Sequence, residues 1–198
     1  MKRLFWLLPI FCLVSAPARA IHFKKEHLYL DANANFASVG NASSSVASSP
    51  TLLGYGLGLS IGYDVIRVFF LGFAADAEWV GQYTAPDDAT GNRRGNRLQF
   101  SPQIGARIGD FVFKGDYQFM GNYNLSTSDA AGNTVSYTKP SGFRLQALYG
   151  LTEDIYGGLI YQSVSFSNQH LVGPNAGDTA LSQNFSLTQF GVTLAYTF

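Results

Sequence analysis

The stretch Phe190-Gly-Val-Thr-Leu-Ala-Tyr-Thr-Phe198 alternates between apolar side chains and small or weakly polar ones. A strict period of two is typical of a β-strand with one apolar face. The sequence therefore predicts a final strand that ends on an aromatic residue. Its apolar positions are Phe190, Val192, Leu194, Tyr196 and Phe198.

The same alternation recurs along the chain, and clear helix signals are absent. In the stretch 53–63 the second face consists almost entirely of glycine, which would leave holes in the core of a soluble protein but makes room inside a narrow barrel. We expect eight strands in all, near residues 26–36, 53–63, 68–80, 97–108, 111–125, 142–151, 155–167 and 186–198.

The connections between these strands alternate in length. Short links near 64–67, 109–110 and 152–154 alternate with long polar ones at 38–51, 82–96, 126–140 and 168–184. This rhythm is typical of an even-stranded antiparallel barrel with short turns at one end and long loops at the other. The predicted fold class is all-β, an eight-stranded antiparallel up-and-down β-barrel.

Two places depart from a regular strand pattern. Pro102 lies in the middle of the fourth stretch, and proline removes a ladder donor, so we expect a local bulge there. In the stretch 155–167, Leu159 and Tyr161 suggest one phase, whereas Val164 and Phe166 suggest the other. A second bulge would explain that change.

The N-terminus has the pattern of a secretory signal peptide. Lys2 and Arg3 precede an apolar run over 4–14, which is shorter than the roughly 20 residues of a spanning helix, and the run is followed by Ala18-x-Ala20. We expect cleavage of residues 1–20 and a mature domain over 21–198. The mature chain would be mildly acidic and would lack Cys12, the only cysteine, which argues against a nucleic-acid partner, disulfides and a thiol nucleophile.

Alternation alone leaves open which face is the core, because a soluble eight-stranded barrel would place its apolar face inside. Three features favour a transmembrane barrel with its apolar face in lipid: strand length, aromatics near strand ends, and a polar face with nearly balanced charge. The aromatics are Tyr63, Trp79, Phe111, Tyr123, Tyr149, Tyr196 and Phe198. The charges, expected to form an interior ion-pair network that closes the lumen, are Asp76, Glu78, Arg97, Arg107, Lys114, Asp116 and Arg144.

The whole mature chain resembles the small eight-stranded outer-membrane barrels of the OmpA-membrane-domain, OmpX and OmpW kind. The most specific element of the resemblance is the terminal strand over 190–198, which such proteins use as an assembly signal. The resemblance implies an outer-membrane location in a Gram-negative bacterium, with both termini in the periplasm. It also implies contact with outer-membrane lipid, lipopolysaccharide, the barrel-assembly machinery and periplasmic chaperones, and a monomeric state.

Chemistry-bearing patterns are weak. The histidines are His22, His27 and His170, and only His170 follows serines, among them Ser167, at the outer end of a predicted strand. Some outer-membrane lipid A deacylases use a surface His/Ser pair with a carboxylate that orients the histidine, but no carboxylate has a clear claim to that role here. We expect no catalytic residues, no cofactor and no metal site.

The predicted function is therefore non-enzymatic: a structural or surface-interaction barrel whose long outer loops meet partners. A narrow channel for small solutes is the alternative, and it would require a gap in the interior charges. An outer-leaflet lipid-modifying enzyme centred near His170 is a further alternative.

Overall fold

The computed structural model describes residues 28–43, 51–66, 68–82, 93–128, 132–174 and 176–198. The predicted signal peptide and the first seven residues of the expected mature chain lie outside this part. Within the described ranges, no helix is long and apolar enough to cross a membrane.

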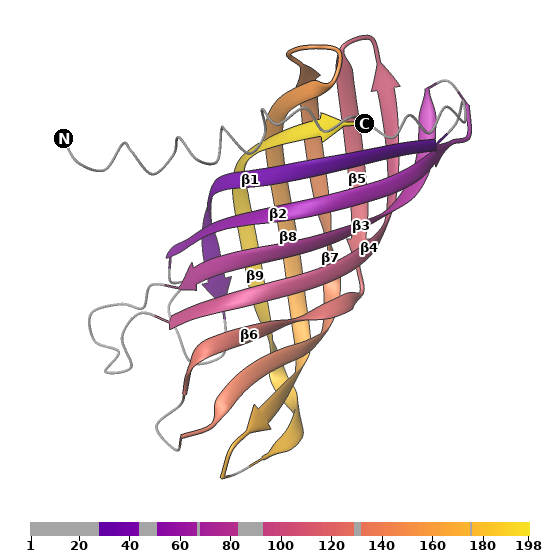
Figure 1. Ribbon diagram of the computed structural model, residues 1–198. Coiled ribbons are helices and arrows are strands. Elements are labelled where there is room, and N and C mark those ends of the chain that lie inside the picture. The colour runs from indigo at the N-terminus through magenta and orange to yellow at the C-terminus, as the bar shows by residue number, and fades with distance from the viewer. Residues whose placement is uncertain (1–27, 44–50, 67, 83–92, 129–131, 175) are drawn as a thin grey trace, which may run out of the picture.

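The described chain forms one antiparallel sheet that closes on itself (Figure 1). β5 and β6 are two halves of one strand, interrupted at Phe119, so the ring has eight members, and the predicted fold class is confirmed. The strands are β1 (Leu28–Ser43), β2 (Thr51–Asp64), β3 (Phe69–Gln82), β4 (Arg93–Ile108), β5 (Phe111–Gln118), β6 (Met120–Ser128), β7 (Thr134–Gly150), β8 (Ile155–Val172) and β9 (Gly177–Thr197).

The ring closes between β1 and β9, as the sequence predicts. Asn33 pairs with Ala195, and the backbone N–H of Phe198 donates to the carbonyl of Leu30 at 2.9 Å. The three short turns, the start of β1 and the end of β9 share one end of the barrel, which we call the turn end. The opposite end, where the strands run furthest, is called the loop end.

The outward face is apolar over most of the barrel, and the inward face is polar. Leu57 on β2, Phe73 on β3 and Ile104 on β4 are each more than half exposed, whereas Gln99, Gln118 and Gln162 are almost completely buried. A soluble barrel would have the reverse arrangement. The outward face therefore suits lipid, as a transmembrane barrel requires.

The two faces exchange polarity near the loop end. On β8, Tyr161 points outward and Gln162 inward, but the next pair has Ser163 outward and Val164 inward. The same exchange occurs on β9, where Phe190 lies outside and Gln189 inside, and then Leu187 lies inside. We call the level of Gln162 and Ser163 the polarity switch. Beyond it, β8 and β9 have a polar outward face and an apolar inward face, like strands of a water-soluble protein.

This switch corrects the prediction of a bulge within 155–167. β8 pairs with β7 without interruption from Tyr156 to Phe166, so Val164 and Phe166 keep the phase of Ile160. The apolar side chains change faces because the surroundings change from lipid to water, and the backbone does not slip. The register shift on β8 instead lies beyond Phe166, opposite β9.

A real shift occurs next to Pro102. β4 pairs in continuous register with β3, but its other neighbour carries an extra residue at Phe119, where the β5–β6 strand breaks. The bulge expected near Pro102 is therefore present on the neighbouring strand. It inverts the phase of β6, so Tyr123 is fully buried inside the barrel and Asn124 points outward. Tyr123, predicted as one of the aromatics near strand ends of a lipid-facing surface, therefore lies inside the barrel, and that prediction was wrong for this reason.

The long connections are shorter than the sequence suggests. β8 and β9 extend into the stretch 168–184, which was expected to be a loop, so that β8 ends at Val172 and β9 begins at Gly177. β6 and β7 likewise extend into the stretch 126–140. Beyond the polarity switch, the outward residues of these strands are mostly polar, and in these two stretches the sequence does not alternate regularly between apolar and polar residues. The sequence therefore predicts a loop where the structure has strands.

Candidate functional site

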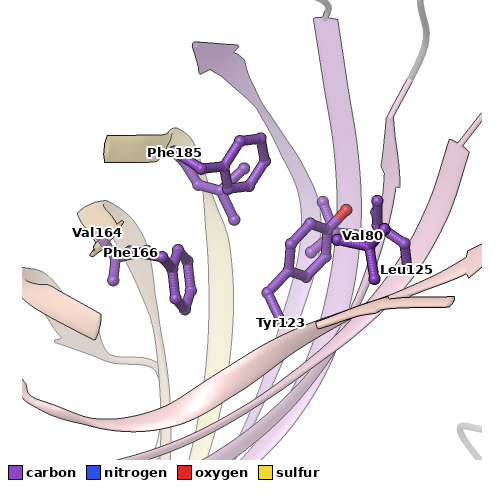
Figure 2. Close-up of a cluster of buried hydrophobic side chains, with 8 residues drawn as sticks. Val80, Tyr123, Leu125, Val164, Phe166 and Phe185 are labelled. Carbon is purple, nitrogen blue, oxygen red and sulfur yellow. The ribbon is translucent and has the colours of Figure 1, made fainter. Parts of the chain in front are cut away.

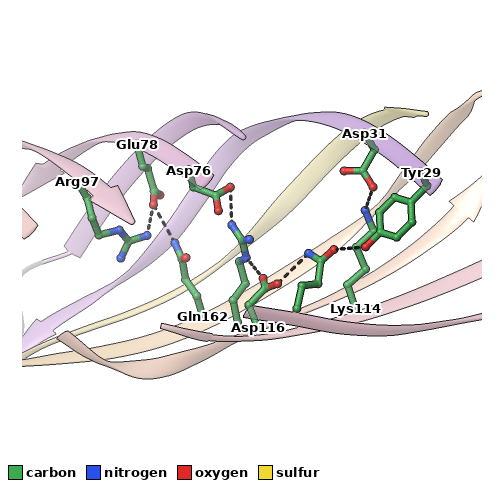
Figure 3. Close-up of polar contacts among 10 residues, drawn as sticks. Tyr29, Asp31, Asp76, Glu78, Arg97, Lys114, Asp116 and Gln162 are labelled. Atoms are coloured by element: carbon green, nitrogen blue, oxygen red, sulfur yellow. Dashed lines mark hydrogen bonds and ion pairs between the residues drawn. The ribbon is translucent and has the colours of Figure 1, made fainter. Parts of the chain in front are cut away.

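The lumen holds a layer of buried charges at its middle (Figure 3). Arg97 on β4 forms an ion pair with Glu78 on β3, its direct cross-strand neighbour. Gln162 on β8 donates to Glu78 at 3.0 Å and also to Gln189 on β9 at 2.8 Å. These contacts cross the lumen from β3 and β4 to β8 and β9, so they fill it.

A second chain of contacts runs towards the turn end. Arg144 on β7 lies between two carboxylates, with Nη1 at 2.6 Å from Asp76 and Nε at 2.5 Å from Asp116. Gln103 donates to Asp116 at 2.8 Å and accepts from the Tyr29 hydroxyl at 2.9 Å. One buried guanidinium therefore serves two buried acids, and the amide of Gln103 extends this network to β1.

Lys114 on β5 contributes a fourth ion pair, at 2.5 Å from Asp31 on β1. Arg107 lies apart from the other predicted network residues, at the turn end, where it pairs with Asp64. The guanidinium carbon of Arg107 lies 4.6 Å from the ring centroid of Phe70. Six of the seven predicted residues thus meet in the middle of the lumen, and Arg107 closes its turn end.

Sequence reasoning missed Asp31 and the buried glutamines as members of this network. The signal was present, since Asp31 shares the inward phase of β1 with Asn33, and Gln103 shares that of β4 with Gln99. The prediction was limited to a set of nearly balanced charged residues that did not include Asp31, and neutral side chains such as Gln103 were not counted.

The inward face of β2 explains how long side chains fit in so narrow a barrel. A Cβ added at Gly62 would overlap the ring of Tyr29, and one added at Gly58 would overlap Asp76 and lie 2.7 Å from both amide atoms of Asn33. The glycines of β2 therefore leave the space that side chains from β1 and β3 occupy.

An apolar layer closes the loop end of the lumen (Figure 2). The Tyr123 ring stacks on Phe185 at 5.7 Å between centroids, and Tyr137 stacks on Phe185 at 4.1 Å. The buried members of the layer, here named the outer plug, are Val80, Tyr123, Leu125, Val135, Val164, Phe166, Phe185 and Leu187.

A smaller apolar layer lies at the turn end, and we call it the inner plug. Tyr29 packs against Phe70 edge to face, with 4.7 Å between ring centroids. The inner plug consists of Tyr29, Phe70, Val112, Leu148 and Ala195, with Tyr156 packed against it. The charged layer is thus enclosed between two apolar layers.

The outward surface beyond the polarity switch carries a row of polar residues across β6 to β9. Asn124 is opposite Ser136, Ser136 is opposite His170, and His170 is opposite Asp178. His170 Nδ1 lies 2.7 Å from Asp178 Oδ1, and the Ser136 hydroxyl donates to Asn124 at 2.6 Å. The carboxylate that sequence reasoning did not find is Asp178, and the serine that faces His170 is Ser136 rather than Ser167.

Hydroxyl groups occupy the same surface between this row and the apolar band. Ser165 and Ser186 form a hydrogen bond at 2.7 Å, and Ser163 and Thr188 form one at 3.3 Å. The Tyr117 hydroxyl reaches a further serine, Ser141, at 3.1 Å. This surface, defined by Ser141, Ser163, Ser165, Ser186 and Thr188, is called the hydroxyl face.

Comparison with known proteins gave a match in structure only. No protein-family model matches the chain, and no curated protein sequence matches it. Among solved structures, Neisserial surface protein A (NspA) superposes with a TM-score of 0.58 over 86% of this chain and 97% of that protein, at 16% sequence identity. The chain has the fold of a small outer-membrane β-barrel.

Other outer-membrane barrels also match this barrel, but less closely. Ail of Yersinia pestis, solved with the heparin analogue sucrose octasulfate, is 12% identical, with a TM-score of 0.49 over 87% of this chain and 99% of that one. OprG of Pseudomonas aeruginosa is 15% identical, with a TM-score of 0.45 over 86% and 95%. The resemblance predicted from sequence is confirmed at the level of an outer-membrane barrel fold.

The predicted assembly strand is the last strand of this outer-membrane barrel. Phe190 and Val192 point outward, and about half of each side chain is exposed. Tyr196 and Phe198 meet edge to face at 4.8 Å beside the turn end. Its role as an assembly signal stays a prediction.

Proposed function

We propose that this protein is an integral protein of a bacterial outer membrane, with both termini in the periplasm and a closed lumen. We further propose that it acts through the surface of its loop end rather than as a conduit. The single observation that carries this proposal is the enclosure of the charged layer between the outer and inner plugs. The proposal retains the non-enzymatic, structural or surface-interaction role predicted from sequence.

The physical argument is one of dehydration. A hydrated ion that enters the lumen from the loop end would have to pass Tyr123, Phe185 and the other rings of the outer plug, where it loses water contacts without gaining polar partners. Eight strands enclose a space that side chains fill, without room for a wide water path. The narrow-channel alternative needs a gap in the interior, and both plugs argue against one.

The chemistry of the outer surface suggests partners for this protein. The outward apolar band suits lipid, and the hydroxyl groups of the hydroxyl face support contact with the sugar head groups of lipopolysaccharide. Small hydroxyl side chains such as Ser165 and Ser186 suit hydrogen bonding to sugar hydroxyls. Assembly with the help of periplasmic chaperones and the barrel-assembly machinery, and function as a monomer, complete the proposal.

Conductance in planar lipid bilayers tests the closed lumen. We expect the refolded mature protein to give no unitary current steps at any polarity in symmetric potassium chloride. A known porin, inserted under the same conditions, controls for insertion, and protease protection of the inserted barrel verifies its presence. Stepwise currents that scale with protein added would contradict the closed lumen and support the channel alternative.

A second candidate function is ester hydrolysis at the outer surface, and one observation favours it. His170 is fixed by Asp178 on one side and faces Ser136 on the other, which is the order of an acid–base–nucleophile row. Against it, the Ser136 hydroxyl donates to Asn124 in this structure and not to His170. Catalysis would require rotation of that side chain.

Mass spectra of membrane lipids separate the two candidates. Overexpression of the wild-type protein and of Ser136→Ala in the same host should leave identical lipid A and phospholipid profiles if the protein is not an enzyme. A loss of acyl chains that depends on Ser136 and His170, but not on the neighbouring Ser165, would establish the second candidate and overturn the non-enzymatic role.

A further inference from the structure

The charged layer contains more carboxylates than cationic groups. Its buried acids in the described part of the chain are Asp31, Asp76, Glu78 and Asp116, and its buried bases are Arg97, Lys114 and Arg144. Lys114 neutralises Asp31 and Arg97 neutralises Glu78, whereas Arg144 alone serves both Asp76 and Asp116. The layer therefore carries one negative charge in excess, and an uncompensated buried charge is strongly unfavourable.

Most of the buried side-chain oxygen atoms that have no hydrogen-bond partner among the described residues lie on one wall of the same layer. That wall consists of β1, β2, β3 and β9. Further unpartnered oxygens, Ser101 Oγ on β4 and Gln118 Oε1 on β5, lie outside it. The wall also carries one unpartnered nitrogen, Nδ2 of Asn33, and the other unpartnered nitrogens lie on β4, β5 and β7. The oxygens on this wall are Asp31 Oδ1, Asn33 Oδ1, Asn35 Oδ1, Ser60 Oγ, Asp76 Oδ2 and Thr193 Oγ1, whereas Asp76 Oδ1 pairs with Arg144. The excess negative charge and the unpartnered oxygens thus coincide.

The register places two of these side chains, Asn33 and Asp76, over Gly58. Asn33 pairs with Gly58, and Gly58 pairs with Asp76, so the amide and the carboxylate meet over a residue without a side chain. Ser60 is the next inward residue on β2 and pairs with Asp31. Asn33, Asp76 and Ser60 are each more than nine-tenths buried.

We propose that the lumen binds a single monovalent hard cation of the alkali-metal class, with sodium as the expected ion, on the wall over Gly58. Asp76 supplies the charge through Oδ2, the oxygen that Arg144 does not bind, and Asn33, Ser60 and the free Oδ1 of Asp31 supply further oxygen ligands. Hard cations prefer carboxylate, amide and hydroxyl oxygens. The single excess negative charge of the layer matches the single positive charge of such an ion. The described residues contain no group of three or more His, Cys, Asp or Glu side chains that could hold a metal ion, so the ligands proposed here are mainly neutral oxygens.

The outer and inner plugs would slow the exchange of such an ion with the solution. Because an apolar layer lies on each side, the ion enters while the barrel folds and then exchanges slowly with the solution. The site is independent of the surface role proposed above, since it acts on the stability of the barrel and not on its partners. Failure of one proposal therefore leaves the other standing.

Elemental analysis of the refolded mature protein tests the proposal. The protein is refolded into detergent micelles in sodium chloride, transferred by gel filtration into choline chloride, and assayed for sodium per protein. We expect one retained equivalent in the wild type and in Glu153→Gln, an exposed acid at the turn end. We expect none in Asp76→Asn, whose interior is neutral, and a strongly reduced content in Asn33→Ala, whose charge is unchanged.

A thermal measurement covers the case in which Asp76→Asn does not fold. The midpoint of the heat-modifiable mobility shift of the wild type should be higher after refolding in sodium chloride than in choline chloride of equal ionic strength, and Asn33→Ala should lose most of that difference. Absence of retained sodium in the wild type, together with equal midpoints, would overturn the proposal. A proton would then neutralise the excess carboxylate.

Discussion

Phe185 on β9 stacks on Tyr137 on β7 with 4.1 Å between ring centroids and 11° between ring planes, although β8 lies between their strands. The two rings therefore meet inside the barrel, across the face of β8. Phe166 of β8 packs against both of them, at 6.3 and 6.4 Å. This contact makes the outer plug continuous over three neighbouring strands.

Removal of one plug ring should weaken the barrel. Phe185→Ala should destabilise it by about 3–5 kcal/mol, because it leaves a cavity among packed rings. Phe190→Ala on the same strand is the matched control, since Phe190 points outward. Urea unfolding in lipid vesicles measures both. Equal midpoints for the two variants would contradict the assignment of Phe185 to a packed core.

The shared guanidinium of Arg144 should be the most costly charge to remove. Arg144→Met leaves Asp76 and Asp116 buried without their cation, and the expected loss is about 3–5 kcal/mol. Arg107→Met, at the partly exposed turn end, should cost roughly 1 kcal/mol or less. The difference in unfolding midpoint between the two variants is the measurement, and a larger effect at Arg107 would refute the network described for the lumen.

A single methyl group on β2 should interfere with folding. Gly58→Ala places its Cβ against Asp76 and Asn33, whereas a Cβ at Gly177 in the β8–β9 hairpin has nothing within 4 Å. We expect Gly58→Ala to give a low folded fraction on unheated detergent gels and Gly177→Ala to match the wild type. Normal folding of Gly58→Ala would mean that the side chains over β2 can move aside.

Deletion of Phe198 should impair assembly in cells. The deletion removes the backbone bond from Phe198 to Leu30 and the ring contact with Tyr196 at the closing seam. Val172→Ser, which changes an exposed apolar residue at the tip of the β8–β9 hairpin, is the control. The measurement is the amount of heat-modifiable protein in outer-membrane fractions, compared between the two variants. A greater loss of this protein from Val172→Ser than from the deletion would count against an assembly signal at Phe198.

Membrane orientation can be tested with single cysteines, because the predicted mature chain has none. Thr179→Cys at the loop end should react with a membrane-impermeant maleimide in intact cells. Glu153→Cys at the turn end should react only after the outer membrane is permeabilised. The opposite pattern would reverse the proposed orientation of the termini.

The barrel was predictable from sequence because alternation reports the surroundings of each face directly. It identified eight strands, their closure between β1 and β9, and six of the residues that meet in the lumen. Alternation gave the wrong face for the residues after Phe119, because the one-residue bulge there lies on the strand next to Pro102 and the amino-acid sequence around Phe119 does not indicate it. It failed at Val164 because a change of environment and a change of register produce the same pattern.

The surface row near His170 was less accessible. Asp178 lies eight residues from His170, in a stretch that has no apolar alternation, and Ser136 belongs to another hairpin. Only the pairing of β7, β8 and β9 brings the three together. Contacts across a sheet depend on register, and the sequence defines register poorly where neither face is apolar.

The polarity switch at Gln162 and Ser163 also sets a length. On β8 and β9, the outward face between this level and the turn end is built for hydrocarbon, and the outward face beyond it is built for water. The chain thus specifies the thickness of the bilayer it needs. A thinner bilayer would expose the ring of Tyr161 to water, and a thicker one would draw the hydroxyl groups of Ser163 and Ser165 into hydrocarbon, so either mismatch carries a cost.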